Sequence, residues 1–230
     1  MKTLTRTALP RIVLASSSPR RIELLTRLQL NPLVHSPDVD EKPLKGESPA
    51  ALVRRLSRLK AEAVALKLAA ELPHALVIAA DTIVVSPDGK RILGKPDSPA
   101  DAARMLKQIA GRKHTVLTAY TILRQGGSAQ PRRPAHLTRV VRSSVWIRKL
   151  TNETIRAYVA TGEPLDKAGS YAAQGIGMSF IERISGSYTN VVGLPASQLI
   201  SDLEGVFRFP VLSRLSGESV EKAAAKVLFA

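Results

Sequence analysis

One segment organises this 230-residue sequence: Leu14-Ala-Ser-Ser-Ser-Pro-Arg-Arg-Ile-Glu-Leu-Leu25. It starts in a short apolar run that predicts a buried strand. Ser18 suits the N-cap of a following helix and Pro19 its first position, because proline there loses no hydrogen bond. Hydroxyl groups, free backbone N–H groups and the guanidinium groups of Arg20 and Arg21 then meet at one strand-to-helix turn. This combination indicates an anion site, most plausibly for phosphate, with a solvated surface turn as the simpler alternative.

Length and composition are typical of a globular protein. With 230 residues, 44% of them hydrophobic, we expect one domain over residues 1–230, built as one unit or as two closely associated lobes. The absence of cysteine excludes disulfides, thiolate catalysis and zinc–thiolate sites. No apolar run approaches the ~20 residues of a membrane span, and the apolar run after the basic start is too short for a signal peptide. These features predict a cytoplasmic protein without a membrane partner.

The chain is strongly basic, with 34 Lys and Arg against 19 Asp and Glu, and a net charge of +15. Such a charge raises the possibility of a polyanionic partner, either nucleic acid or nucleotide. The basic residues are spread along the chain, however, and aromatic residues make up only 4% of it, which is few for stacking single-stranded bases. We therefore favour a basic solvated surface and expect no specific nucleic-acid partner.

The most informative strand is predicted between His74 and Val85. Six consecutive apolar residues lead to Asp81-Thr82, and three more apolar residues follow. A continuous run of this kind is typical of a strand buried on both faces of an α/β sheet. A carboxylate there costs on the order of several kcal/mol unless it is paired or binds a metal. Asp81 is therefore a candidate functional carboxylate, and the alternative is a structural aspartate that caps a turn.

Local patterns predict the remaining elements. Ser-Pro pairs at residues 48–49 and 98–99 predict two further helices, the first with Lys60 beside its apolar face, ordinarily a surface position. Strands are expected at residues 115–123 and 137–147, and helices at 151–160, 197–203 and 219–228. The segment 125–136 is expected to be a loop or hairpin tip, with no function assigned to it.

Two glycine-containing motifs fail as nucleotide signatures. Residues 89–96 nearly match a P-loop, but Pro96 replaces the hydroxyl residue that binds magnesium, so only Lys95 is kept as a phosphate-binding candidate. Gly175-Ile-Gly177 has no third glycine in place and no preceding strand, so it does not predict a dinucleotide fold. The polar segment 163–177 is long for a loop in a compact domain, and such loops are usually functional.

Together these segments resemble the Maf (septum-formation-inhibitor-like) family of nucleoside triphosphate pyrophosphatases. The similar region covers about residues 12–203, whereas the C-terminal extension, residues 206–230, lies outside it and has no assigned role. The matching motifs occur in the order of the family: Ala15-Ser-Ser-Ser-Pro-Arg-Arg21, Leu59-Lys60-Ala61, Ala80-Asp81-Thr82, Leu93-Gly-Lys-Pro96, Gly111 with His114, Asp166-Lys-Ala-Gly169, Gln174-Gly175 and Gly193-Leu-Pro195.

The resemblance implies an α/β fold in which a long mixed sheet is flanked by helices and two lobes surround a deep cleft, in a protein that is often a homodimer. It also implies hydrolysis between the α and β phosphates of a nucleoside triphosphate, with a divalent cation, Mg²⁺ or Mn²⁺, as cofactor. The residues implied by position are the catalytic carboxylate Asp81, the metal ligands Glu41 and Asp81, and the phosphate-binding group Ser16, Arg20, Arg21, Lys60 and Lys95. His114 is expected to be a structural hydrogen-bonding residue.

Within the family, Arg20, Thr82 and Gln174 resemble the branch that acts on dTTP and UTP. The branch that acts on 7-methyl-GTP differs at the positions of Thr82 and Gln174, and it remains the alternative within the family. A non-catalytic nucleic-acid-binding or division-regulating protein is the alternative from another class, and its main support is the charge of +15. A phosphatase that releases inorganic phosphate would use the same groups on a different phosphorus atom.

Overall fold

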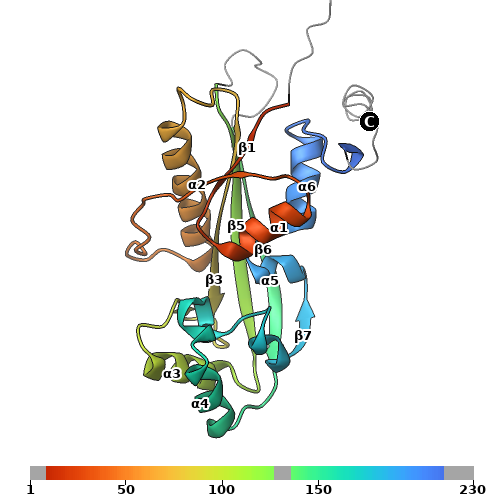
Figure 1. The fold of residues 1–230 in the computed structure, drawn as a ribbon. Coiled ribbons are helices and arrows are strands. Elements are labelled where there is room, and N and C mark those ends of the chain that lie inside the picture. Colours follow the sequence, from red (N-terminus) through yellow and green to blue (C-terminus); the bar gives the residue numbers. More distant parts are fainter. Residues whose placement is uncertain (1–8, 127–135, 215–230) are drawn as a thin grey trace, which may run out of the picture.

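The structure is a computed structural model that describes residues 9–126 and 136–214. Within these residues one mixed sheet contains seven strands: β1 (Ile12–Ala15), β2 (Leu33–His35), β3 (Leu76–Val85), β4 (Ile92–Leu93), β5 (Lys113–Arg124), β6 (His136–Ile147) and β7 (Ile181–Ser185). The sheet order is β2-β1-β3-β5-β6-β7, and β4 pairs with the end of β3. β1 runs parallel to β2 and β3, and the other pairs are antiparallel. The expected α/β fold with a long mixed sheet flanked by helices is confirmed (Figure 1).

The first four described α-helices begin where the sequence predicts. The described helices are α1 (Pro19–Arg27), α2 (Pro49–Lys67), α3 (Pro99–Ile109), α4 (Asn152–Ala160), α5 (Tyr188–Val192) and α6 (Ala196–Gly205), with short 3₁₀ helices η2 (Glu163–Asp166), η3 (Ala168–Ser170), η4 (Ile176–Phe180) and η5 (Leu212–Arg214). Ser48 and Ser98 accept hydrogen bonds from backbone N–H groups of α2 and α3. Ser18 occupies the N-cap of α1 and Pro19 its first position, as predicted, although the Ser18 side chain makes no capping hydrogen bond. None of these helices is both long and apolar enough to cross a membrane.

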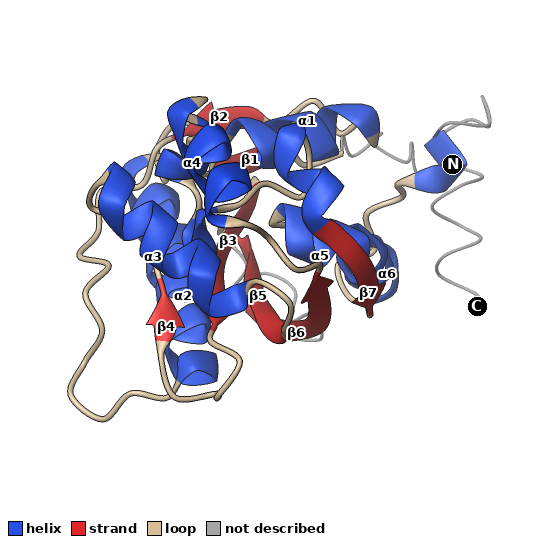
Figure 2. Cartoon of the chain, turned by 90° about the horizontal axis from the view of Figure 1, so that it is seen from below, coloured by secondary structure: helices blue, strands red, loops and turns tan. Residues whose placement is uncertain are grey.

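The alternation of side chains along β3 builds cores on both faces of the sheet. Val77 and Ala79 pack beneath α2, in one core, and Ile83 and Val85 join the next core along the same helix. Leu76, Ile78 and Ala80 point to the opposite face, where they meet residues of α1 and α6. Figure 2 shows α2 and α6 on opposite sides of the strands. Because both faces are covered, β3 is the doubly buried strand that its continuous apolar run predicts.

The helices form two groups along the sheet. α1, α2 and α6 flank the half that contains β1 and β2, while α3 and α4 lie at the other end of the long strands (Figure 1). A separate core at that end joins residues of α3 and α4 to the ends of β3, β5 and β6. The strands β3, β5 and β6 therefore run through both groups. The cavity described below is lined by residues of α1 and α2 and by residues of η2 and η3, which contact α4 and α3.

Three segments differ from the expectations of the sequence. β2 and the short helix α5, residues 188–192, have no counterpart among the elements predicted from the sequence. The long segment 163–177 contains two complete 3₁₀ helices and the start of a third, with extended residues between them. Most of the 125–136 loop and the predicted helix at 219–228 lie outside the described residues.

Candidate active site

One cavity of about 610 Å³ collects every catalytic, phosphate-binding, specificity and metal-binding candidate that the sequence singles out. Its lining comes from α1, α2, the open part of β3, the loops after β1 and β2, and the segment around η2 and η3. The sequence-predicted residues that line it are Ser16, Arg20, Arg21, Glu41, Lys60, Asp81, Thr82, Lys95 and Gln174.

The cavity lies at an interruption in the sheet. β1 pairs with β3 only as far as Ala79, and β4 begins to pair on the same side of β3 at Val84. Residues 80–83 of β3 therefore form a short open edge. The carboxyl ends of the parallel strands β1 and β2 reach the same place, so that the loops after Ala15 and His35 contribute to the lining. Crevices outside the carboxyl ends of parallel strands are common ligand sites in α/β sheets.

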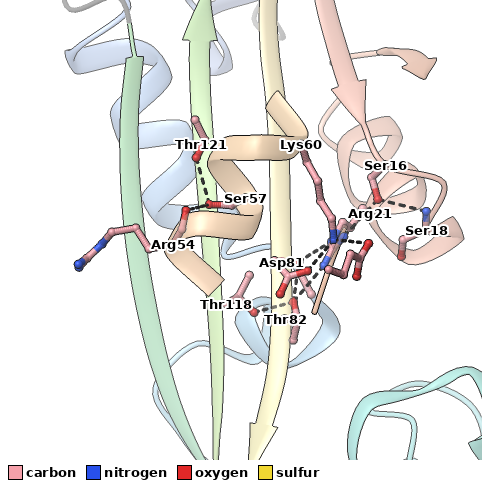
Figure 3. A network of polar contacts seen from close by, with 12 residues as sticks. Ser16, Ser18, Arg21, Arg54, Ser57, Lys60, Asp81, Thr82, Thr118 and Thr121 are labelled. Atoms are coloured by element: carbon pink, nitrogen blue, oxygen red, sulfur yellow. Dashed lines mark hydrogen bonds and ion pairs between the residues drawn. The ribbon is translucent and has the colours of Figure 1, made fainter. Parts of the chain in front are cut away.

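This open edge explains how two adjacent residues with opposite directions both reach the cavity. Asp81 shares the direction of Ala79 and Ile83, toward α2, whereas Thr82 shares the direction of Ala80, toward α1. In Figure 3 the Lys60 side chain descends from α2 to Asp81, and Arg21 reaches Thr82. β5 pairs with β3 along its other edge, but no strand pairs with residues 80–83 on the edge that β1 and β4 share, so side chains on both faces of β3 can reach the cavity there.

On the α2 side, three charged groups form an ion cluster. The Nζ of Lys60 donates to Oδ1 of Asp81 at 2.7 Å and lies 2.9 Å from Oε1 of Glu41. Lys60 and Asp81 are buried, at 6% and 7% exposure, while the side chain of Glu41 is 60% exposed. Lys60 is therefore not the surface lysine that its position beside the apolar stripe ordinarily indicates. The buried carboxylate that the strand pattern predicted is paired, as its burial cost requires.

On the α1 side, Arg21 holds several groups together. Its Nε donates to the carbonyl of Gly193 at 2.9 Å, its Nη1 to Oγ of Ser16 at 3.2 Å, and its Nη2 to Oγ1 of Thr82 at 3.1 Å. Burial lowers the pKa of Arg21, and the nearby Asp81 carboxylate opposes that shift. A guanidinium group has five N–H donors, so donors remain for a ligand. Arg21 thus ties α1, β3 and the turn after α5 to one another.

The hydroxyl group of Thr82 has a defined direction. Thr118 donates its only hydroxyl proton to the carbonyl of Asn190 at 2.9 Å, so the 2.9 Å contact between Thr82 and Thr118 requires Thr82 to be the donor. Thr82 also accepts from Arg21. Its remaining lone pair can therefore only accept a hydrogen bond from a ligand.

Two further cations lie at the rim of the cavity. The guanidinium group of Arg20 is 3.7 Å from the Asp166 carboxylate, with side-chain exposures of 30% and 66% respectively. Lys95 is exposed and lines the same cavity. Neither position is enclosed, so both cations can turn toward a polyanionic ligand without breaking a buried contact.

The two carboxylates fit the cation chemistry that the resemblance implies. Glu41 and Asp81 converge on one ammonium nitrogen, which shows that their oxygens can share a cation. Among the described residues no group of three or more His, Cys, Asp or Glu could hold a metal ion. Two carboxylates completed by water and phosphate oxygens match the usual coordination of Mg²⁺, which rarely uses an all-protein cage.

His114 has the structural surroundings expected of it. It is 1% exposed, and its Nε2 forms a 2.8 Å hydrogen bond with the hydroxyl of Tyr171. The two rings also meet edge to face, with centroids 5.3 Å apart. Burial lowers the pKa of His114 from 6.5 to about 4, so the ring is neutral at physiological pH.

Three contributors to the site had no role assigned from the sequence: Thr118, and, within the matching motifs, the Gly193 carbonyl and Lys167. Lys167 lines the cavity and donates to the carbonyl of Glu163 at 3.0 Å. The Thr118 position follows from the antiparallel register that places it opposite Thr82. Pairing the two predicted strands in this register would have identified Thr118, because two threonines at matched positions of neighbouring strands can hydrogen-bond.

Comparison with known proteins gives consistent results. The family model described as "Maf-like protein" matches residues 11–206. A protein of Shewanella denitrificans named dTTP/UTP pyrophosphatase is 50% identical, over 80% of this chain and 89% of its own length. One of Moorella thermoacetica with the same name is 48% identical, over 89% of this chain and 99% of its own length.

Among solved structures, the Staphylococcus aureus Ham1 protein aligns with a TM-score of 0.41 and 19% identity, covering 74% of this chain and 79% of that chain. The family assignment depends instead on the family model and on relatives of nearly half-identical sequence. By these matches the chain belongs to the Maf family.

Proposed function

We propose that this protein hydrolyses dTTP and UTP to the nucleoside monophosphate and pyrophosphate. The names of the relatives support this reaction. The observation that carries it is the position of Asp81, a buried carboxylate on the open edge of β3, in a cavity whose rim bears uncommitted cations. Attack of water on a tetra-anionic triphosphate needs a base, charge neutralisation and a stabilised leaving group.

In this proposal Asp81 is the general base that takes the proton of the attacking water. Lys60 orients the carboxylate through the 2.7 Å hydrogen bond. An ammonium group has three donors, of which Asp81 and Glu41 engage two, so the third can bind a phosphate oxygen. Arg20 and Lys95, together with Ser16 and the remaining donors of Arg21, would bind the rest of the triphosphate.

We propose that Glu41 and Asp81 hold a divalent cation, Mg²⁺ or Mn²⁺, together with the substrate. Such a cation would neutralise phosphate charge and make the phosphorus atom more electrophilic. Lys60 would then exchange one or both of its carboxylate partners for a phosphate oxygen. The high exposure of Glu41 supports this exchange, because an exposed carboxylate can move at little cost.

We propose that the nucleotide base is selected on the face of β3 that points toward α1, opposite the carboxylates. Thr82 offers an acceptor, and Gln174 has both a donor and an acceptor to offer to a pyrimidine edge. A site built on such hydrogen bonds rejects a base that leaves its polar groups unpaired. Arg20, which resembles the specificity position of the dTTP/UTP branch, lies on the same rim. The family resemblance also favours a homodimer, which a measurement of mass in solution would test.

The decisive assay is a panel of nucleoside triphosphates, including 7-methyl-GTP, in Mg²⁺ buffer made with water labelled with oxygen-18. The proposal expects dTTP and UTP to be cleaved fastest, with the label in dTMP or UMP, because attack occurs at the α phosphorus. Label in inorganic phosphate would identify a phosphatase, and preference for 7-methyl-GTP would move the chain to the other branch. The same preparation should bind duplex DNA weakly, with affinity falling steeply as salt rises.

A further inference from the structure

The segment from Ala172 to Gly177 carries Gln174 past the cavity and has little structure of its own. Ala172, Ala173 and Gln174 line the cavity, and only the last two residues of the segment enter the 3₁₀ helix η4. A segment without a backbone ladder takes its position from side chains outside it. The structure identifies three such side chains: Tyr188 of α5, whose hydroxyl donates to the carbonyl of Ala173 at 3.3 Å, and a pair from α4 and η2 that holds the segment on both sides of Gln174.

Glu163 holds the far end of this segment. Its Oε2 accepts from the backbone N–H of Ile176 at 2.9 Å, and its Oε1 accepts from that of Gly177 at 2.9 Å. Oε1 also accepts from the hydroxyl of Tyr158 at 2.8 Å. One carboxylate thus receives three hydrogen bonds, two of them from the segment itself.

Tyr158 holds the near end. Its hydroxyl oxygen accepts from the backbone N–H of Ala172 at 3.1 Å while its proton goes to Glu163. The ring is 2% exposed and meets Phe180 edge to face, with centroids 4.8 Å apart. The pair therefore anchors the segment on both sides of Gln174 from a fixed position in the core of α3 and α4.

The glycines of the segment fit closely around this pair. A Cβ at Gly175 would lie 2.4 Å from Oε2 of Glu163, and the backbone there has φ +78°. A Cβ at Gly177 would lie 2.6 Å from the hydroxyl of Tyr158 and 2.7 Å from the carbonyl of Ala172. The backbone therefore wraps around the two polar groups with no room for another side chain.

The protonation states of Glu163 and Tyr158 match the hydrogen bonds that they make to the segment. Burial opposes ionisation of Glu163, but the N–H groups of Gly177 and Ile176 outweigh it and lower its pKa. Burial and the Glu163 hydrogen bond raise the pKa of Tyr158, so its hydroxyl keeps its proton. An ionised carboxylate only accepts, which matches the three donors that surround it.

We propose that Glu163, acting with Tyr158, is a positioning residue for base selection: it fixes the segment 172–177 so that Gln174 faces the nucleotide base. Neither residue appears in the lining of the cavity, so both act through the segment. The inference depends on the proposed function, since it concerns how the same site discriminates between bases.

The test substitutes Glu163→Gln, with Glu153→Gln as the matched control. Glu153 is an exposed residue of α4, so the control makes the same change of charge nearby without touching the segment. The glutamine amide group can accept at only one of its two ends, so at least one N–H of the segment loses its partner. We expect the preference for dTTP over dCTP to fall by roughly 10-fold, with KM for dTTP rising more than kcat falls.

Hydrogen–deuterium exchange supplies a readout independent of turnover. Peptides covering residues 172–178 should exchange faster in Glu163→Gln, because at least one of the Ile176 and Gly177 amides loses its acceptor, and peptides of α2 and β3 should not change. Tyr158→Phe keeps the ring and removes the hydroxyl, so it should release the Ala172 amide and lower discrimination by a smaller factor. It also provides the test if Glu163→Gln does not fold.

The outcomes separate the two claims. Unchanged discrimination between dTTP and dCTP in a folded, active Glu163→Gln or Tyr158→Phe protein would overturn the positioning role. Absence of pyrophosphate release from dTTP and UTP by the unmodified protein would instead overturn the proposed function. In that second case, unaltered exchange over residues 172–178 in Glu163→Gln would contradict the anchoring as well.

Discussion

The two sides of β3 at its open edge are built differently. Toward α2, Asp81 depends on one ion pair with Lys60, and the third member of the cluster, Glu41, is mostly exposed. Toward α1, Thr82 belongs to a closed network in which Arg21 and Thr118 connect it to neighbouring backbone carbonyls (Figure 3). The carboxylates on the α2 side can therefore change their ion-pair partners, whereas the hydrogen bonds on the α1 side hold Thr82 in one orientation.

This difference separates two tasks. The proposed catalysis requires carboxylates that can exchange an ammonium partner for a metal ion, and Asp81 and Glu41 on the α2 side are placed for this exchange. Base selection requires hydrogen-bonding groups with fixed directions, since loosely held groups would adapt to any base. The anchored segment 172–177 has the same character as the Thr82 network, because its position is set by Glu163 and Tyr158.

The largest expected effect is on the α2 side. Asp81→Asn should lower kcat for dTTP by ~10²–10⁴-fold, because an amide cannot accept the proton of the attacking water. The fold should persist, since the amide oxygen can still accept the hydrogen bond of Lys60. Steady-state kinetics measures the loss, and circular dichroism checks the fold. Near-normal kcat in a folded variant would remove Asp81 from the mechanism.

A buried group on the Thr82 side should make the protein sensitive to acid. The folded protein resists protonating His114 until about pH 4, whereas the unfolded chain takes up that proton below 6.5. The unfolding free energy should therefore fall as the pH is lowered from 6.5 to 4, by up to about 3 kcal/mol. Urea titrations at several pH values measure it. His114→Asn should flatten this part of the profile, and an unchanged slope would exclude His114 as its source.

A smaller effect on stability is expected from Arg21, which hydrogen-bonds to three other residues of the Thr82 network. Arg21→Lys keeps the charge but cannot reach Gly193, Ser16 and Thr82 at once, so unfolding free energy should fall by roughly 1–3 kcal/mol. Discrimination between dTTP and dCTP should fall with it. Arg20→Lys is the matched control, because Arg20 makes only a 3.7 Å ion pair, and its stability should be unchanged. Equal destabilisation by the two variants would contradict the special position of Arg21.

The smallest effect concerns the loop that carries Glu41. Glu47 accepts hydrogen bonds from Arg55 at 2.7 and 2.8 Å, and Arg55 also donates to the carbonyl of Lys42. The Arg55 guanidinium lowers the pKa of Glu47 from 4.5 to about 2. Its contribution to stability should thus be present above pH 4.5 and disappear as the pH falls toward 2. Glu47→Gln should lack this acid transition in a denaturation profile, and a retained transition would assign it to another carboxyl group.

Much of the molecule was predictable because local patterns control it. The apolar run ending at Asp81 predicted a doubly buried strand, and the Ser-Pro starts predicted α1, α2 and α3. The family resemblance predicted which residues would meet, since all nine candidate site residues line one cavity. These signals involve neighbours in sequence or a motif order that any fold of this family must satisfy.

What escaped prediction depends on contacts between distant segments. Lys60 appeared to be a surface residue because its burial comes from β3 and the Glu41 loop rather than from α2. The partnership of Thr82 with Thr118 required the register of β3 on β5. Glu163 gave no signal at all, since its three donors lie between 5 and 14 residues away along a segment without periodicity.

The central claim, that the two sides of β3 separate catalysis from base selection, is tested most directly by nucleotide binding to the Asp81→Asn protein. Calorimetric titration with dTTP and with dCTP, in the presence of Mg²⁺, gives both affinities without turnover. We predict that this inactive variant still prefers dTTP by nearly the same factor as kcat/KM of the unmodified protein, because Thr82, Gln174 and their supports are intact. Loss of that preference together with turnover would show that one set of contacts performs both tasks and would contradict the claim.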